Sequence, residues 1–198
     1  MKKLAFLFIV TLLISCNNKV EKKEESKKTE TTSEQKEVQQ EINILVKDTV
    51  DNNMMLLGKI TLQGFKAADF SEWFSENYNN HPLDIETIKA ISPKLKDINI
   101  KVFMGTWCSD SQRETPALYK ILDAAEFDYS NIEIIAVNHD KETPKHLEKN
   151  MDIQYVPTII FYKEGKEIGR YVELAQETLE KDMLAILNET GYKHSYEE

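Results

Sequence analysis

The sequence predicts an α/β domain in which a mixed central sheet is flanked by helices. Three observations carry this prediction. Strand and helix patterns alternate from about residue 41, a strand–turn–strand pattern lies near the C-terminus, and an amphipathic helix closes the chain. The order strand–helix–strand, helix, hairpin, helix implies helices on both faces of the sheet.

The first elements are two extended segments followed by two helices. Residues 42–46 and 54–61 look extended, although an Asp-Asn-Asn break separates them. The first helix carries apolar side chains on one face, namely Phe70, Trp73, Phe74 and Tyr78. Asp84 is placed to cap a second helix, which carries Ile85, Ile88, Ile91 and Leu95.

The central and C-terminal elements show clearer patterns. We expect strands at 99–104, ending at Gly105, and at 132–137, with a helix between them that turns Leu118, Ile121, Leu122 and Ala125 inward. Residues 141–150 predict a short polar helix with Pro144 in its first turn. Strands at 158–162 and 167–172 flank a tight turn at 163–166. A helix at 177–187, with Leu179, Met183, Ile186 and Leu187 inward, ends the domain.

The N-terminus has the three-part pattern of a secretory signal. Lys2 and Lys3 precede an apolar run over residues 4–13, which is short for a membrane span. The following Leu-Ile-Ser-Cys, ending at Cys16, resembles the lipobox of bacterial lipoproteins. This resemblance implies removal of residues 1–15, lipidation of Cys16, and an exported protein lipid-anchored to a bacterial membrane, on its periplasmic or surface face. An uncleaved membrane anchor with a chance cysteine is the alternative.

Residues 16–40 are expected to form the lipidated cysteine and a flexible tether. Residues 17–40 consist mainly of Glu, Lys, Ser, Thr and Gln, and they offer too little apolar surface to pack a core. The formal charge of −9 argues against a nucleic-acid partner, because phosphate contacts need clustered Lys and Arg. No histidine spacing indicates a metal site, and no cofactor is expected.

Cys108 is the one thiol expected in the mature protein, because the only other cysteine is Cys16. It lies in Val-Phe-Met-Gly-Thr-Trp-Cys-Ser-Asp-Ser-Gln-Arg-Glu-Thr-Pro, residues 102–116, which resembles the active-site region of the thioredoxin superfamily. Trp107, Cys108 and Pro116 match the family's pattern. Ser111 stands where the family has its second cysteine, and Val102 stands where many members have a buried aspartate.

A second stretch supports the same resemblance. Val156, Pro157 and Thr158 resemble the cis-proline loop that lies against the reactive cysteine and presents backbone groups to a bound partner. The two motifs imply a thioredoxin fold with a thioredoxin-like core over residues 98–192, preceded by an N-terminal helical extension over 41–97.

The expected position of Cys108 at a helix N-terminus favours a thiolate, through unpaired backbone N–H groups and the helix dipole. Asp110 opposes this by like charge, and Arg113 offsets Asp110. Glu173 is either a modulator of the thiol or a solvated loop residue. An inert thiol that fills space remains the alternative for Cys108.

Two functions follow from these residues. In the first, Cys108 forms mixed disulfides with exported proteins or small thiols, with Trp107 and Ser111 beside it in the site. Ser111 can hydrogen-bond to the sulfur but cannot resolve the adduct. In the second, the protein is a redox-inactive binding module for exported proteins. The sequence leaves open whether the chain is an enzyme, a monothiol thiol–disulfide oxidoreductase, or neither.

Overall fold

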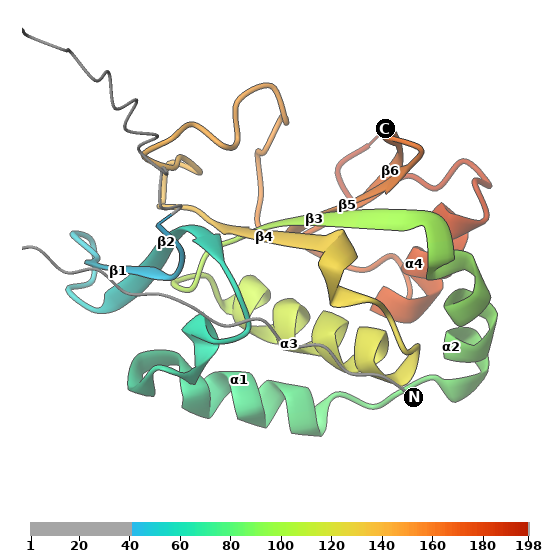
Figure 1. Cartoon of the computed structure of the whole chain (residues 1–198), viewed down its shortest axis with the longest axis horizontal. Helices are drawn as coiled ribbons and strands as arrows, with labels where there is room; N and C mark the ends of the chain where they lie inside the picture. The colour runs from blue at the N-terminus through green and yellow to red at the C-terminus, as the bar shows by residue number, and fades with distance from the viewer. Residues whose placement is uncertain (1–40, 198) are drawn as a thin grey trace, which may run out of the picture. The chain divides into compact units, whose positions relative to one another are not determined.

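The computed structural model describes residues 41–197 (Figure 1). The predicted signal peptide, Cys16 and the tether therefore lie outside the described residues. The strands are β1 (Ile44–Lys47), β2 (Met54–Ile60), β3 (Ile98–Met104), β4 (Ile132–Ala136), β5 (Thr158–Lys163) and β6 (Lys166–Val172). The α-helices are α1 (Ala68–Asn80), α2 (Ile85–Ile91), α3 (Ser109–Ala124) and α4 (Leu179–Leu187). Short 3₁₀ helices span Gly64–Lys66, Ser92–Asp97 and Tyr129–Asn131.

The strands form one mixed sheet in the order β1-β2-β4-β3-β5-β6. Strands β3 and β4 are parallel, whereas the other neighbouring pairs are antiparallel. Val102 of β3 pairs with Ile134 of β4 and Ile159 of β5, so β3 lies in the interior of the sheet. The mixed sheet with flanking helices is confirmed, and the N-terminal extension adds β1 and β2 to one edge.

The two faces of the sheet are covered differently. Side chains from α1, α2, α3 and α4 all pack with Val102 and its neighbours in one large core cluster. The opposite face carries a smaller cluster around Phe103, Ile135 and Ile160, which is covered by the loop over residues 138–157. Figure 1 shows α1 and α3 on one side of β3 and β4 and this loop on the other. The expectation of helices on both faces is therefore wrong.

The predicted helix at residues 141–150 is also wrong, because this segment is a series of turns. Lys141, His146 and Asn150 have positive φ angles, which interrupt any right-handed helix. The Asn138 side chain accepts hydrogen bonds from backbone N–H groups that a helix would use otherwise. Backbone N–H groups in this segment therefore donate to nearby side chains, where a helix would have them donate to backbone carbonyls.

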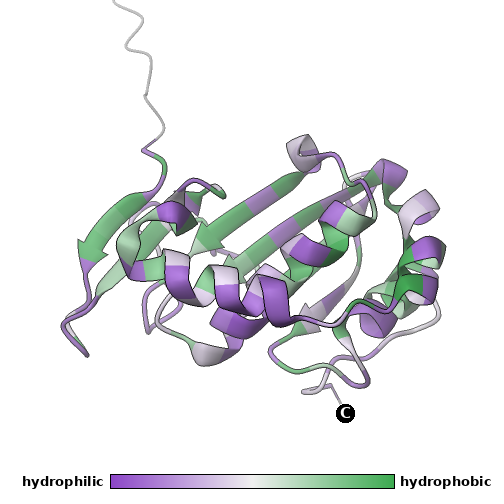
Figure 2. Ribbon diagram, turned by 90° about the horizontal axis from the view of Figure 1, so that it is seen from below, coloured by the Kyte–Doolittle hydropathy of each residue, from purple (hydrophilic) through white to green (hydrophobic). Residues whose placement is uncertain are grey.

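The other predicted helices are present, but α2 ends at Ile91, so Leu95 lies in the following 3₁₀ helix, and Ile85 is exposed. Asp84 caps α2 by accepting a hydrogen bond from the Thr87 backbone N–H at 3.1 Å. Helix α4 begins at Leu179 rather than at 177, because Thr178 is its N-cap. In Figure 2 the strands are largely green, whereas purple and green bands alternate along the helices. The side chains predicted to face inward from α3 and α4 are buried.

Candidate active site at Cys108

The loop between β3 and α3 holds Cys108 at the N-cap of α3. The Cys108 backbone N–H donates to the Gly105 carbonyl at 3.0 Å, and the Gln112 side chain donates to the Thr106 carbonyl at 2.7 Å. A Cβ atom on Gly105 would lie 2.5 Å from the Trp107 ring, so only glycine lets the indole lie against the backbone there. The loop is therefore fixed before any partner binds.

The Cys108 thiol contacts the predicted proline loop directly. Its Sγ lies 3.2 Å from the Val156 carbonyl oxygen, to which the thiol donates, and the thiol is free and partly exposed. The Val156–Pro157 peptide bond is cis. The side chain of Thr158 is buried, and its hydroxyl donates to the Tyr155 carbonyl at 2.7 Å. The two motifs therefore meet, with Val156 next to the sulfur and Thr158 supporting the loop from behind.

Ser111 holds the backbone of the β3–α3 loop. Its side chain is fully buried, and its oxygen accepts a hydrogen bond from the Gly105 backbone N–H at 3.2 Å. Within the described residues the partner of the Cys108 sulfur is the Val156 carbonyl, not the Ser111 hydroxyl. Val102 is fully buried in the large core cluster. Neither position offers a group that can attack a disulfide.

The charges that follow Cys108 are paired with one another. Arg113 Nη1 lies 2.8 Å from an Asp110 carboxylate oxygen, and Arg113 Nε lies 2.7 Å from a Glu114 carboxylate oxygen. The expected offset of Asp110 by Arg113 is therefore present, but Glu114 shares the same guanidinium. Because half of the Arg113 side chain is exposed, these ion pairs contribute little to the stability of the fold.

The Trp107 side chain contacts two residues, Val137 and His139, that no sequence motif links to it. Its Nε1–H donates to the Val137 carbonyl at 2.9 Å, and its ring stacks on the His139 imidazole at a centroid distance of 4.1 Å. His139 Nε2 in turn lies 2.7 Å from a carboxylate oxygen of Asp48, which is buried. Asp48 lies in the β1–β2 turn, far from Cys108 in the sequence, so no local motif could have indicated it.

Asp48 should make the stability of the fold depend on acidic pH. The Val50 backbone N–H, 2.8 Å from the carboxylate, and then His139 hold the pKa of Asp48 below its usual value. A lowered folded-state pKa stabilises the protein above the unfolded pKa, and this contribution is lost as the pH falls through the folded value. We therefore expect Asp48→Asn to be less stable than the wild type at pH 7 and to approach it near pH 3, as measured by urea unfolding. A constant difference across that range would contradict this assignment.

Glu173 follows β6 and lies beside the proline loop. Its backbone N–H donates to the Pro157 carbonyl at 2.8 Å. Its carboxylate accepts a hydrogen bond from the Tyr196 hydroxyl, and the Tyr196 ring stacks on Tyr155. The carboxylate thus has a phenol as its partner. The sequence could not indicate this, because Tyr196 comes from the end of the chain.

Among residues 41–197, no group of three or more His, Cys, Asp or Glu side chains is arranged to hold a metal ion. In the same range no helix is both long and apolar enough to cross a bilayer.

Comparison with known proteins gives the family. The thioredoxin family model matches residues 88–185. A thioredoxin from Ictalurus punctatus is 31% identical over 101 residues, which are 49% of this chain and 91% of that protein. A thioredoxin from Mus musculus is 26% identical over 95 residues, which are 48% of this chain and 82% of that protein. The solved structure of oxidized thioredoxin O2 from Arabidopsis thaliana has 19% identity and a TM-score of 0.34, covering 55% of this chain and 90% of that chain. Because the Ictalurus match spans nearly the whole of that thioredoxin, the chain belongs to the thioredoxin family.

Proposed function

We propose that the protein is a monothiol member of its family, which forms mixed disulfides through Cys108. Thioredoxin family membership supports thiol–disulfide exchange as the general chemistry. The observation that carries the proposal is the contact of Cys108 Sγ with the Val156 carbonyl, combined with a serine at position 111. This contact joins the thiol to the proline loop that a bound partner would meet, and position 111 supplies no second thiol.

The reaction is a balanced exchange. The Cys108 thiolate attacks one sulfur of a disulfide, the Cys108–partner S–S bond forms, and the original S–S bond breaks. The released sulfur leaves as a thiolate and takes up a proton. Ser111 cannot repeat this attack, because its hydroxyl stays protonated near neutral pH and accepts a hydrogen bond from Gly105. An external thiol, from a protein or a small molecule, is therefore required to free Cys108. The partners that Cys108 attacks are disulfide-bonded proteins or the disulfides of small thiols.

Lipid anchoring is the second part of the proposal. The apolar run over residues 4–13 and the Ser-Cys junction at Cys16 support export and lipidation, which would place the domain at a bacterial membrane surface. We expect the wild-type protein to incorporate labelled palmitate in the cells that make it, and Cys16→Ser to incorporate none, because the lipid is attached at this residue. A palmitate label that persists in Cys16→Ser, or that is absent from the wild type, would contradict lipid anchoring.

The thiol chemistry is tested with Cys108→Ala. The Cys16→Ser protein, in which Cys108 is the only thiol, is incubated with insulin, and disulfide-linked adducts are followed on non-reducing gels. We expect one adduct that dithiothreitol removes, and none with Cys108→Ala in the same background. A Cys108 that reacts with neither disulfides nor iodoacetamide would overturn the proposal and leave a redox-inactive binding module.

A further inference from the structure

The end of the chain folds back onto the surface next to the active site. Residues 192–197, here called the C-terminal tail, are held by side-chain hydrogen bonds along their length. The Tyr192 hydroxyl donates to Asp182 at 2.9 Å, and the Ser195 hydroxyl donates to the Leu174 carbonyl at 2.7 Å. The tail is therefore an ordered part of the described structure.

Tyr196 is the tail residue that approaches the active site. Its ring lies parallel to that of Tyr155, with centroids 3.9 Å apart and planes inclined by 10°. Its hydroxyl donates to the Glu173 carboxylate, which raises the pKa of Tyr196 to about 12. The phenol therefore keeps its proton, and this hydrogen bond is available, throughout the physiological pH range.

These two contacts flank the proline loop that receives the Cys108 thiol. Tyr155 precedes Val156, whose carbonyl lies 3.2 Å from the sulfur, and Glu173 is bonded through its backbone to Pro157. An extended partner chain advances by about 3.3 Å per residue. A chain joined to Cys108 would thus reach the Tyr155–Tyr196 pair within a few residues of its own cysteine.

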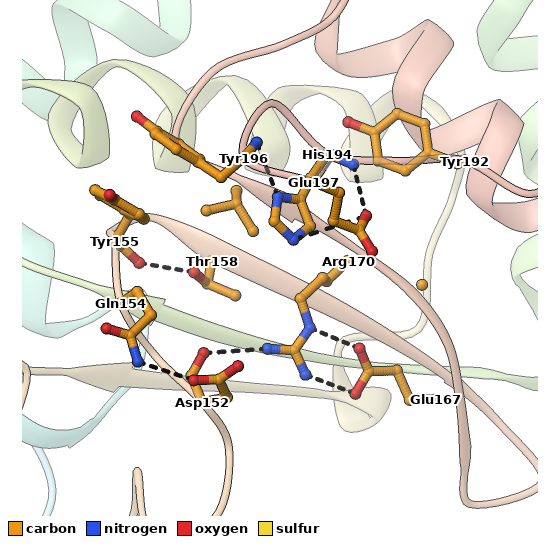
Figure 3. A pocket seen from close by; sticks show the side chains of 12 residues that line it. Asp152, Gln154, Tyr155, Thr158, Glu167, Arg170, Tyr192, His194, Tyr196 and Glu197 are labelled. Carbon is orange, nitrogen blue, oxygen red and sulfur yellow. Dashed lines mark hydrogen bonds and ion pairs between the residues drawn. The ribbon is translucent and has the colours of Figure 1, made fainter.

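The tail lines one side of a cavity. A cavity of about 560 Å³ lies between the tail, strand β6 and the loop before the cis proline (Figure 3). Tyr155, Tyr192, His194 and Tyr196 lie around it in Figure 3, and Arg170 is paired with Glu167 at its base. Tyr192 packs against the large core cluster, whereas Tyr196 is exposed. Displacing Tyr196 alone therefore breaks its ring contact with Tyr155 and its hydrogen bond to Glu173, and it leaves Tyr192 in place.

We infer that Tyr196 is a specificity-determining residue, which restricts the approach of protein disulfides to Cys108 and leaves small disulfides free to react. The inference rests on the proposed thiol–disulfide exchange. A small disulfide needs only the partly exposed sulfur, whereas a folded protein brings flanking chain that meets the Tyr155–Tyr196 pair. When Tyr196 is displaced, Tyr155 becomes available to stack against the partner.

The test compares two probes on the same variants. The Cys16→Ser full chain is made with Tyr196→Ala, with Tyr196→Phe, and with Lys163→Ala as a control in an exposed ion pair at the β5–β6 turn. The rate of Cys108 adduct formation is measured with insulin and with 5,5′-dithiobis(2-nitrobenzoic acid). We expect Tyr196→Ala to speed the insulin reaction by about threefold to tenfold, the effect of losing one aromatic pair and one hydrogen bond. The small-probe rate should change by less than about twofold, as expected for a surface change away from the sulfur.

The remaining variants separate the two contacts of Tyr196. Tyr196→Phe keeps the stacked ring and loses the bond to Glu173, so its insulin rate should fall between those of the wild type and Tyr196→Ala, while Lys163→Ala should match the wild type. An unchanged or slower insulin reaction in Tyr196→Ala, or an equal acceleration with both probes, would overturn the inference while leaving the exchange chemistry intact. If Cys108 reacts with neither probe in any variant, the proposed function itself fails, and this inference fails with it.

Discussion

Replacing Ser111 with cysteine is expected to let the protein release its own partner. Ser111 lies in the first turn of α3, three residues after the N-cap Cys108, and side chains at this spacing are neighbours. A thiol there can attack the Cys108–partner disulfide, forming an internal disulfide and freeing the partner's thiol. We expect the lifetime of the adduct to fall by at least about 100-fold, because an intramolecular attack replaces one that depends on an external thiol.

This result is measured by the intact mass of the protein after a pulse of oxidised glutathione. In a Cys16→Ser background, Ser111→Cys should lose the adduct and end two hydrogens lighter than the reduced protein. Ser111→Ala is the matched control, since it also removes the hydroxyl that accepts the Gly105 N–H but supplies no thiol. An adduct that persists in Ser111→Cys as long as in Ser111→Ala would show that the replaced cysteine does not explain the monothiol behaviour.

Introducing the buried aspartate that many thioredoxins carry should be costly here. Val102 is fully buried in an interior strand and packs in the large core cluster. A carboxylate at this position loses its hydration without a charged partner, so we expect Val102→Asp to lower the free energy of unfolding by about 3 to 5 kcal/mol at pH 7.

The pH dependence distinguishes a buried charge from a packing defect. Burial raises the pKa of the new carboxyl above its unfolded value, so the variant is least destabilised below the unfolded pKa, and the penalty grows as the pH rises above it. Val102→Ala is the control; it should cost about 2 kcal/mol through lost packing, independently of pH. Urea unfolding at pH 4 and pH 7 measures both variants. If Val102→Asp lowered the free energy of unfolding equally at the two pH values, the new carboxyl would be hydrated rather than buried.

The features that the sequence predicted correctly depend on patterns among residues that are close together in the chain. Apolar spacing along α3 and α4 identifies their buried faces, because each face depends on residues within one helix. The strand–turn–helix at Cys108 and the Val-Pro pair at residues 156–157 are equally local. Their meeting at the sulfur could be expected only from the family resemblance, since 48 residues separate the thiol and the Val156 carbonyl that it contacts.

The features that the sequence did not predict depend on contacts between distant segments. The loop at 138–157 has polar residues that are compatible with a helix. Its side chains instead form hydrogen bonds with the loop's own backbone, and its few apolar side chains pack in the smaller cluster against the sheet. The pairing of Asp48 with His139 joins an edge hairpin to the loop after β4. Likewise, the contact of Tyr196 with Tyr155 and Glu173 depends on how the chain returns after α4.

Hydrogen bonds at four residues define the β3–α3 loop around Cys108. The Gly105 backbone N–H donates to the Ser111 hydroxyl, the Trp107 side chain donates to the Val137 carbonyl, and the Cys108 thiol donates to the Val156 carbonyl. Ser111 therefore has a structural partner in the loop and supplies no second thiol. This is the arrangement that the proposed monothiol exchange requires, in which an external thiol frees Cys108.

The most direct test of this account is the fate of the Cys108 adduct after the free disulfide is removed. The Cys16→Ser protein is incubated with oxidised glutathione, desalted, and followed by intact mass spectrometry with peptide mapping. We expect a single glutathione adduct on Cys108 that persists until dithiothreitol or another thiol is added. Failure to form the adduct, or its spontaneous loss without an added thiol, would contradict the account.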